Sequence, residues 1–270
     1  MKNVDDLTRI DFCNDVWLKR EDLFEIAGVR GGKVRTCYKL ARAAAESGKK
    51  VLVTVGSRLS PQIEIVAHIA KYFGMRCRAH TTLGDLSEEL LCAKSLGAEI
   101  IQHPMGFNNV LSARAVADVL TDSDSALIPF GMKSVEAIQS TRLQVQNLPS
   151  ECRRIVVPVG SGMTVAGILH GLIDFGIKKP VIGILIGGNV RSTMDRFAPL
   201  FWRQTVEFID DGLPYKKLVD ARIGNCILDP IYEAKAARFL KPGDLFWCVG
   251  IRKARMLGGT TGVIQARKGR

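Results

Sequence analysis

Hydrophobic and polar residues alternate in blocks along most of this chain. Short runs rich in β-branched residues end in a glycine or a polar residue. Each run is followed by a segment with hydrophobic residues three or four positions apart. Residues 51–56, VLVTVG, are such a β-branched run, and residues 63–73 are a following segment with hydrophobic residues at helical spacing. Repeated pairs of this kind predict right-handed β-α-β units on a parallel sheet.

The same patterns predict the other elements. Further strands are expected from residue 16 into the charged edge at 19–22, at 75–82, 126–131, 180–188 and 245–251, and at 155–162, where the strand runs into a glycine-rich turn. In the stretch 96–102, a helix ends at the glycine and the chain enters another strand. Further helices are expected at residues 86–96, 110–120, 133–148, 164–175, 192–205 and 231–240. The final segment, residues 256–270, is rich in glycine and basic residues, and we expect it to be partly disordered.

Composition narrows the class of protein. A chain of 270 residues with 47% hydrophobic content can bury a substantial core. No hydrophobic run reaches membrane-spanning length, and the N-terminal residues do not resemble a signal peptide. The seven cysteines are scattered without a C-x-x-C pair, which is typical of free thiols in a reducing compartment. We therefore expect a soluble cytoplasmic protein with no membrane partner.

The charge balance suggests a further partner. Lysine and arginine number 38 against 27 acidic residues, so the formal net charge is 38 − 27 = +11. Such an excess attracts polyanions, or it serves only to keep the protein in solution. Nucleic acid is therefore one candidate partner, although no recognisable nucleic-acid-binding motif accompanies the charge.

Residues 16–40 contain the first candidate for chemistry. Lys33 directly follows Gly31 and Gly32 at the start of a predicted helix. Bare backbone at the two glycines lets the lysine side chain project into a cleft, as a lysine that forms a Schiff base must. The alternative is an ordinary surface lysine at a helix start.

A second candidate is the run Gly160, Ser161, Gly162, Met163 and Thr164, between a predicted strand and a predicted helix. Backbone N–H groups, the helix dipole and two hydroxyls would converge on a phosphate group there. The run lacks the lysine of a Walker A loop and the spacing of G-x-G-x-x-G, so neither ATP nor a dinucleotide is favoured. An ordinary glycine-rich turn remains the alternative.

Two more stretches lie at predicted strand ends or helix starts. Ser57, Ser60 and Gln62 follow the strand at 51–56, where ligands of parallel sheets usually bind. Ser60 and Gln62 could contact a substrate carboxylate or a cofactor hydroxyl, or Ser60 could simply cap a helix. Tyr232 and Glu233 adjoin at another helix start, where the dipole stabilises a carboxylate. Glu233 could keep a ring nitrogen protonated, or it could face solvent.

The order of these motifs resembles that of the pyridoxal-phosphate enzymes of fold type II, the tryptophan synthase β-like superfamily. The motifs are KREDL, GGK-V-R, T-x-G-x-x-x-S, VGSG-x-T-x-A-G and LDP-x-Y-E-x-K, spread over residues 16–250. The branch containing 1-aminocyclopropane-1-carboxylate deaminase and D-cysteine desulfhydrase is the most similar. The resemblance implies an α/β fold of two domains, each a largely parallel sheet flanked by helices. Residues 1–47 with 133–270 would form the large domain, and residues 48–132 the small one.

The resemblance also implies a role for each candidate residue. Lys33 would form a Schiff base with pyridoxal 5′-phosphate, the 160–164 run would hold the phosphate, and Glu233 would pair with the ring nitrogen. Tyr232 and Ser60 would be catalytic and would contact the substrate together with Ser57 and Gln62. The cofactor would lie in a cleft between the domains, and the protein would be a homodimer. The reaction would be lyase or deaminase chemistry at the α-carbon of a small amino-acid-like substrate.

Three departures from the family pattern bear on the substrate. Gly32 replaces the usual asparagine, Ser60-Pro61-Gln62 replaces S-N-H, and residues 248–251 replace H-T-G-G. They argue against a standard deaminase of free 1-aminocyclopropane-1-carboxylate or D-cysteine. An amino acid moiety attached to a nucleic acid base is one alternative substrate, and a non-catalytic cofactor-binding protein is another alternative. No two histidines have metal-ligand spacing, so no metal site is expected.

Overall fold

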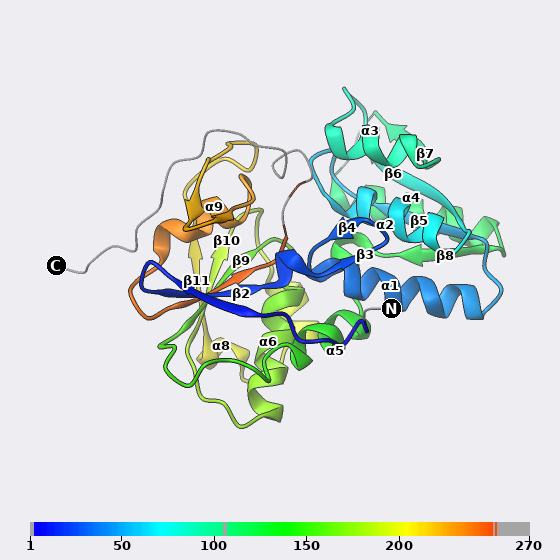
Figure 1. Cartoon of the computed structure of the whole chain (residues 1–270). Helices are drawn as coiled ribbons and strands as arrows, with labels where there is room; N and C mark the ends of the chain where they lie inside the picture. The colour runs from blue at the N-terminus through cyan, green and yellow to red at the C-terminus, as the bar shows by residue number, and fades with distance from the viewer. Residues whose placement is uncertain (1–2, 105–106, 251, 253–270) are drawn as a thin grey trace. The chain divides into compact units, whose positions relative to one another are not determined.

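The structure is a computed structural model that describes residues 3–104, 107–250 and 252. The chain forms two compact units (Figure 1). Of the described residues, unit 1 contains 3–24, 137–250 and 252, and unit 2 contains 25–104 and 107–136. The basic segment at 256–270 lies outside the described residues.

Unit 1 is built on a six-stranded sheet in the order β1-β2-β14-β9-β10-β11. The strands are β1 Ile10–Cys13, β2 Val16–Arg20, β9 Ile155–Val159, β10 Val181–Leu185, β11 Val206–Asp210 and β14 Leu245–Cys248. Only β1 runs antiparallel to its neighbour, and the other pairs are parallel. The β1–β2 turn uses Asn14 and Asp15, both with positive φ, as a two-residue hairpin turn requires.

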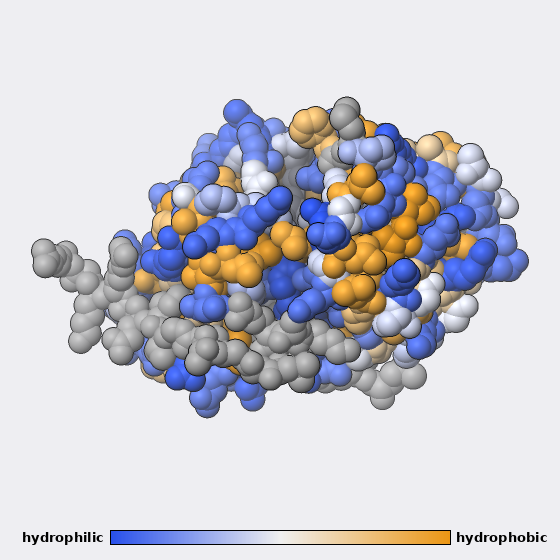
Figure 2. Space-filling model, turned by 90° about the horizontal axis from the view of Figure 1, so that it is seen from above, coloured by the Kyte–Doolittle hydropathy of each residue, from blue (hydrophilic) through white to orange (hydrophobic). Residues whose placement is uncertain are grey.

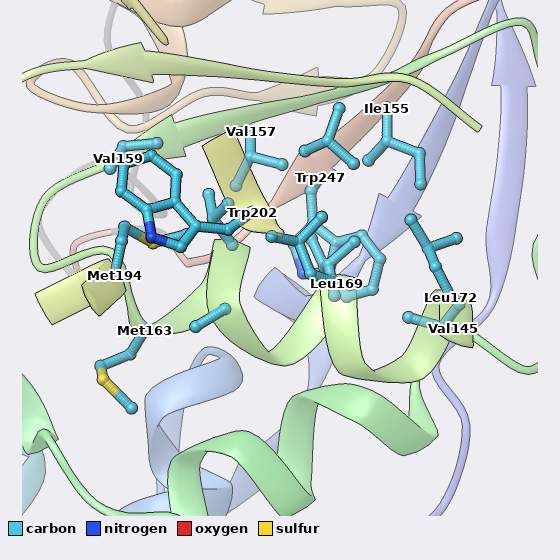
Figure 3. Close-up of a cluster of buried hydrophobic side chains, with 14 of the residues drawn as sticks. Val145, Ile155, Val157, Val159, Met163, Leu169, Leu172, Met194, Trp202 and Trp247 are labelled. Carbon is cyan, nitrogen blue, oxygen red and sulfur yellow. The ribbon is translucent and has the colours of Figure 1, made fainter. Parts of the chain in front are cut away.

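Helix α6, Met163–Asp174, packs against this sheet and encloses the main core of unit 1 (Figure 3). Every residue of the central strand β9 is buried, as in a parallel strand that is covered on both faces. Trp202 and Trp247 fill the space between the sheet and α6, together with Leu169 (Figure 3). At Gly171 of α6, an added Cβ would lie 2.4 Å from the carbonyl oxygen of Arg142. A glycine there allows the close approach of the two backbones.

The other elements of unit 1 are short. The remaining helices are α5 Val135–Leu143, which begins in unit 2, α7 Arg191–Phe197, α8 Trp202–Thr205 and α9 Glu233–Ala236. The 3-10 helices are η1 Glu21–Leu23 and η3 Ala237–Phe239. A two-stranded antiparallel ribbon, β12 Arg222–Ile223 with β13 Cys226–Ile227, completes the unit.

Unit 2 contains a four-stranded parallel sheet in the order β7-β6-β5-β8. Its strands are β5 Val51–Val55, β6 Arg76–Thr82, β7 Glu99–His103 and β8 Ser125–Ile128. Its helices are α1 Gly32–Glu46, α2 Gln62–Tyr72, α3 Glu88–Ser95 and α4 Asn108–Thr121, with the 3-10 helix η2 Phe130–Met132. A small hairpin, β3 Glu25–Ile26 with β4 Val29–Arg30, precedes α1.

The predicted α/β class, with largely parallel sheets flanked by helices, is confirmed. The compact units differ from the predicted domains mainly in residues 25–47. These residues group with unit 2 because α1 packs against α2, where the ring of Tyr38 lies 5.1 Å from that of Phe73.

Some predicted element boundaries were wrong. The single helix expected at 192–205 is two short helices, α7 and α8, with Pro199 between them. The helix expected at 133–148 ends at Leu143, and β14 ends at Cys248. Strand β11 was not predicted, because its partly exposed residues at the edge of the sheet give only a weak periodic pattern.

On the face shown in Figure 2, patches of hydrophobic residues lie among hydrophilic ones. Large hydrophobic side chains with high exposure include Leu120 and Leu200. Among the described residues, no helix combines the length and the apolar character that crossing a membrane requires.

Candidate functional site

The loop after β9 has the geometry of an anion-binding turn. Gly162 is the N-cap of α6 and has φ +87°, a left-handed conformation that glycine adopts without strain. An added Cβ there would lie 3.2 Å from Cβ of Val190. An added Cβ at Gly160 would lie 3.0 Å from the ring of Tyr232. A side chain at either glycine would crowd its neighbours, so the two glycines keep the backbone of this turn accessible. The turn lies at the N-terminus of α6, a helix of twelve residues.

Polar and hydrophobic side chains share this loop. Ser161 and Thr164 are half-buried, so their hydroxyls lie near the surface of the turn, whereas Met163 is buried in the core of unit 1. The hydroxyls and the first N–H groups of α6 are suitable for a phosphate group. Met163 contributes to this arrangement through packing and its backbone N–H.

Asp229 positions the start of α9. Its Oδ1 accepts hydrogen bonds from the backbone N–H groups of Ile231 and Tyr232, both at 2.9 Å. Its Oδ2 lies 3.0 Å from Nε of Arg252, which is also buried. This capping arrangement turns the chain so that Tyr232 reaches Gly160 and Glu233 points into the unit.

Glu233 is buried, and its two carboxylate oxygens differ in their hydrogen bonding. Oε1 accepts hydrogen bonds from the backbone N–H groups of Val249 and Gly250, both at 2.9 Å. Oε2 is buried and has no hydrogen-bond partner among the described residues. Burial, followed by the nearby charge of Asp229, raises the pKa of Glu233 well above its usual value. A buried carboxylate oxygen of this kind requires a donor or a cation.

Tyr232 is paired with a second tyrosine that was not predicted. The hydroxyls of Tyr215 and Tyr232 lie 3.0 Å apart. Burial and the proximity of Tyr215 raise the pKa of Tyr232 well above its usual value, so the phenol remains protonated at neutral pH.

Lys235 holds Tyr215 in place. Its Nζ, which is fully buried, donates to the carbonyl oxygens of Pro214 and Tyr215 at 2.8 and 3.1 Å. The carboxylate of Asp211 lies 3.8 Å from the same nitrogen. Burial lowers the pKa of Lys235. The LDP-x-Y-E-x-K motif contained Lys235 but did not indicate which segment it would hold.

In unit 2, Lys33 is the second residue of α1. The helix begins after Gly31, which has φ +119° and accepts a hydrogen bond from the N–H of Val34 at 3.0 Å. Lys33 is half-buried, and burial lowers the pKa of its amine from 10.5 to about 8. The predicted position at a glycine turn and helix start is confirmed, and its bond to a cofactor stays a prediction.

The predicted loop after β5 is also in unit 2. Ser57 and Ser60 are half-buried, and Ser60 Oγ accepts a hydrogen bond from the N–H of Gln62 at 3.3 Å. Gln62 is buried, and its amide nitrogen lies within 3.2 Å of Thr54 Oγ1, the Val55 carbonyl and the Pro129 carbonyl. The Gln62 amide therefore holds the loop, and its contact with substrate stays a prediction.

Each unit thus gathers one group of the predicted residues. Unit 1 brings the 160–164 loop close to Tyr232, which adjoins Glu233, and unit 2 carries Lys33 with Ser57, Ser60 and Gln62. The residues of unit 1 fit two parts of pyridoxal phosphate. The open turn at the start of α6 fits the phosphate, and Oε2 of Glu233 could accept a hydrogen bond from a protonated ring nitrogen.

Comparisons with known proteins support the same cofactor. Residues 4–196 match the family described as "Pyridoxal-phosphate dependent enzyme". A Thermotoga maritima protein named putative 1-aminocyclopropane-1-carboxylate deaminase is 25% identical over 261 residues, which cover 83% of this chain and 82% of that protein. The glycyl-dTMP PLP-dependent decarboxylase of Pseudomonas phage M6 is 26% identical over 178 residues, which cover 58% of this chain and 64% of the phage protein.

A solved structure supports the fold. The crystal structure of an ACC deaminase homologue matches with a TM-score of 0.77 at 23% identity, covering 93% of this chain and 91% of that one. The predicted resemblance to fold type II pyridoxal-phosphate enzymes is therefore confirmed. The matched range of the family includes Lys33 and the 160–164 loop and ends before Tyr232 and Glu233.

Proposed function

This chain belongs to the pyridoxal-phosphate-dependent enzyme family, and we propose that it is a lyase or deaminase acting at the α-carbon of an amino-acid-like substrate. The names of its relatives support this class, since they include 1-aminocyclopropane-1-carboxylate deaminases. The observation that carries the proposal is the buried Oε2 of Glu233, in the same unit as the phosphate-type turn. When bound, pyridoxal phosphate withdraws electrons from the α-carbon of a substrate amine.

Glu233 would tune the cofactor ring. Two backbone N–H groups fix Oε1, so the carboxylate cannot turn away without losing both hydrogen bonds. Oε2 would then be free to accept a hydrogen bond from a protonated ring nitrogen of the cofactor. A positive charge on that nitrogen would offset the burial that otherwise raises the pKa of Glu233.

Lys33 would be the amine that holds the cofactor and moves protons at the substrate α-carbon. A pKa of about 8 leaves a useful fraction of neutral amine near neutral pH, which a nucleophile or base requires. Tyr232 would act as the proton donor, because its phenol stays protonated. Ser57 and Ser60 would contact the substrate carboxylate, and Gln62 would hold their loop.

A second candidate substrate is an amino acid moiety carried on a nucleic acid base. The phage relative is named as a decarboxylase of glycyl-dTMP, and this chain has a net charge of +11. The positive charge favours an anionic substrate or a nucleic acid partner. The altered Ser60-Pro61-Gln62 loop is consistent with a substrate other than a small free amino acid.

The cofactor part of the proposal is tested by the visible absorption spectrum of the purified protein supplied with pyridoxal phosphate. We expect a visible band that survives gel filtration in the wild type and is absent in Lys33→Ala. Lys39→Ala, a change on the same helix, is the matched control and should keep the band. Equal loss of cofactor from wild type and Lys33→Ala would contradict the assignment of Lys33.

The substrate is tested by comparing three amines: 1-aminocyclopropane-1-carboxylate, D-cysteine and glycyl-dTMP. Release of ammonia or a keto acid from the first two would support the free amino acid substrate. Release of carbon dioxide from glycyl-dTMP would support the nucleotide-linked substrate. Stable cofactor binding without any spectral change or product on adding amines would favour a non-catalytic binding protein.

We also propose two partner properties that need separate measurements. The family resemblance suggests a homodimer, which light scattering of the holoprotein would test. Nucleic acid binding would be tested by titration with DNA at low and moderate salt, because contacts to phosphates weaken steeply with salt. Lack of any salt-sensitive binding would limit the anionic partner to a small nucleotide.

A further inference from the structure

Three side chains of unit 2 that have no role in the proposed function, Glu64, His68 and Cys92, form a cluster of metal-type ligands. Glu64 and His68 are four residues apart on α2, so they share one face of the helix, and Cys92 comes from α3. His68 Nε2 lies 3.8 Å from Sγ of Cys92 and 4.0 Å from Oε1 of Glu64. The three ligand atoms all lie within 4.8 Å of one another.

The orientation of the His68 ring is fixed from behind. Its Nδ1 lies 3.0 Å from the carbonyl oxygen of Ala27. A carbonyl oxygen can only accept, so Nδ1 must carry the proton. In the neutral ring, Nε2 therefore directs its lone pair at Cys92 and Glu64. Histidines that bind metals are commonly oriented by such a hydrogen bond from the other ring nitrogen.

The turn that supplies this carbonyl has an unusual backbone. Ala27 has φ +57° and Gly28 has φ +77° in the two-residue turn between β3 and β4. The ring of His68 lies 3.9 Å from where a Cβ on Gly28 would be, so the turn packs directly on the imidazole. The turn therefore contributes to the cluster by packing as well as by hydrogen bonding.

From this geometry we propose that Glu64, His68 and Cys92 bind one Zn²⁺ ion. Zn²⁺ takes thiolate, imidazole and carboxylate ligands at about 2.0–2.3 Å, which places tetrahedral ligand atoms roughly 3.4–3.6 Å apart. The distances of 3.8 and 4.0 Å need only small side-chain shifts to reach that spacing. Cys92 loses its thiol proton to solvent on binding, and a water molecule takes the fourth position.

The ion would connect three elements of unit 2. It would link α2 to α3 directly, and it would link both to the β3–β4 turn through the ring of His68. The hairpin ends two residues before α1 begins, and Lys33 is the second residue of that helix. Bound zinc would therefore stabilise the segment that leads into the Lys33 turn.

A second group of side chains, Asp22, Cys226 and Cys248, has similar spacing in unit 1. Its carboxylate is already committed, because Asp22 accepts hydrogen bonds from Nε and Nη2 of Arg20 at 2.9 and 2.8 Å. A guanidinium at this position opposes the binding of a divalent cation. This group therefore provides the matched control.

The test uses the full-length protein, freed of metal with a chelator and then titrated with Zn²⁺ in a calorimeter. We expect one ion per chain. His68→Gln and Cys92→Ser should weaken binding by more than the roughly 10–100-fold cost of changing an outer-shell partner. Cys226→Ser should leave the affinity unchanged. Circular dichroism of the metal-free proteins would confirm that each variant is folded.

Titration with Co²⁺ identifies the ligands, because cobalt bound to a thiolate has a charge-transfer absorption band. The band should appear in the wild type and in Cys226→Ser and be absent in Cys92→Ser. The proposal is overturned if no ion binds stoichiometrically, if the band survives in folded Cys92→Ser, or if only Cys226→Ser removes it. None of these readouts involves pyridoxal phosphate, so they are independent of the proposed enzyme activity.

Discussion

The phenolic oxygens of Tyr215 and Tyr232 lie 3.0 Å apart, and the ring of Tyr232 lies next to Gly160. The segment carrying Tyr215 is held by Lys235, whose ammonium group donates to two carbonyl oxygens. Tyr215 and burial both keep the phenol of Tyr232 protonated. The pair therefore presents one oriented hydroxyl next to the loop proposed to hold the phosphate.

Replacing Tyr215 by phenylalanine removes this hydrogen bond and leaves the ring. We expect kcat to fall by roughly 10–100-fold, with a smaller change in KM. This is less than the loss expected when a general acid itself is removed, because Tyr232 is still present. Stability should fall by only about 1 kcal/mol. Steady-state kinetics with whichever of the three candidate amines gives product would check this, with Tyr38→Phe as the control. A rise in KM of roughly 10–100-fold with unchanged kcat would instead indicate that Tyr215 contributes to substrate binding.

The raised pKa of Glu233 predicts how the free energy of unfolding depends on pH. Its pKa is raised in the folded chain, so the folded state holds the proton more tightly than the unfolded state. The contribution of Glu233 to the stability of the cofactor-free protein should therefore be greatest below the ordinary pKa of 4.5 and should be lost as the pH rises above it.

Glu233→Gln cannot ionise and should lose less stability than the wild type between about pH 5 and pH 8. Urea denaturation of both cofactor-free proteins at several pH values measures the difference. Parallel pH profiles for the two proteins would contradict the raised pKa. With the cofactor supplied, the variant should also bind and turn over more weakly, because the amide cannot balance a positive ring.

Lys33 should react as an unusually weak base. Its neutral fraction should rise as the pH increases through about 8, compared with the ordinary value of 10.5. Labelling with an amine-specific reagent at a series of pH values, read by mass spectrometry, would follow this residue directly. The exposed Lys94 serves as an internal comparison. A labelling profile for Lys33 with its midpoint near 10.5 would rule out the lowered pKa.

The two glycines that flank α6 distinguish an effect on the proposed phosphate site from the effect of a strained backbone conformation. Gly162 and Gly176 flank the helix with φ of +87° and +63°. An alanine at either position should cost about 1–2 kcal/mol for the left-handed conformation. Only at Gly162 would the new Cβ crowd a neighbour, Val190, at 3.2 Å, whereas nothing lies within 4 Å at Gly176.

We therefore expect Gly162→Ala to weaken binding of pyridoxal phosphate, while Gly176→Ala leaves it unchanged. Equilibrium titration followed by cofactor absorbance would measure both affinities, and thermal denaturation would measure the shared loss of stability. Equal cofactor affinity in the two variants would show that the turn at 160–164 does not hold the phosphate.

The amino-acid sequence by itself determined the α/β class and most strands and helices. It also located the glycine turns at Lys33 and Gly162 and the Tyr232-Glu233 pair at a helix start. These features depend on the spacing of hydrophobic residues and on the backbone freedom of glycine, which act over a few neighbouring positions.

Only the tertiary structure decided which distant groups meet. Strand β11 forms by pairing with β10, Tyr215 reaches Tyr232, and Cys92 lies beside a histidine 24 positions earlier. The same packing left one oxygen of Glu233 buried with no hydrogen-bond partner in the described part of the chain. Such contacts depend on long-range packing and on the burial of single atoms, and neither leaves a periodic pattern in the sequence.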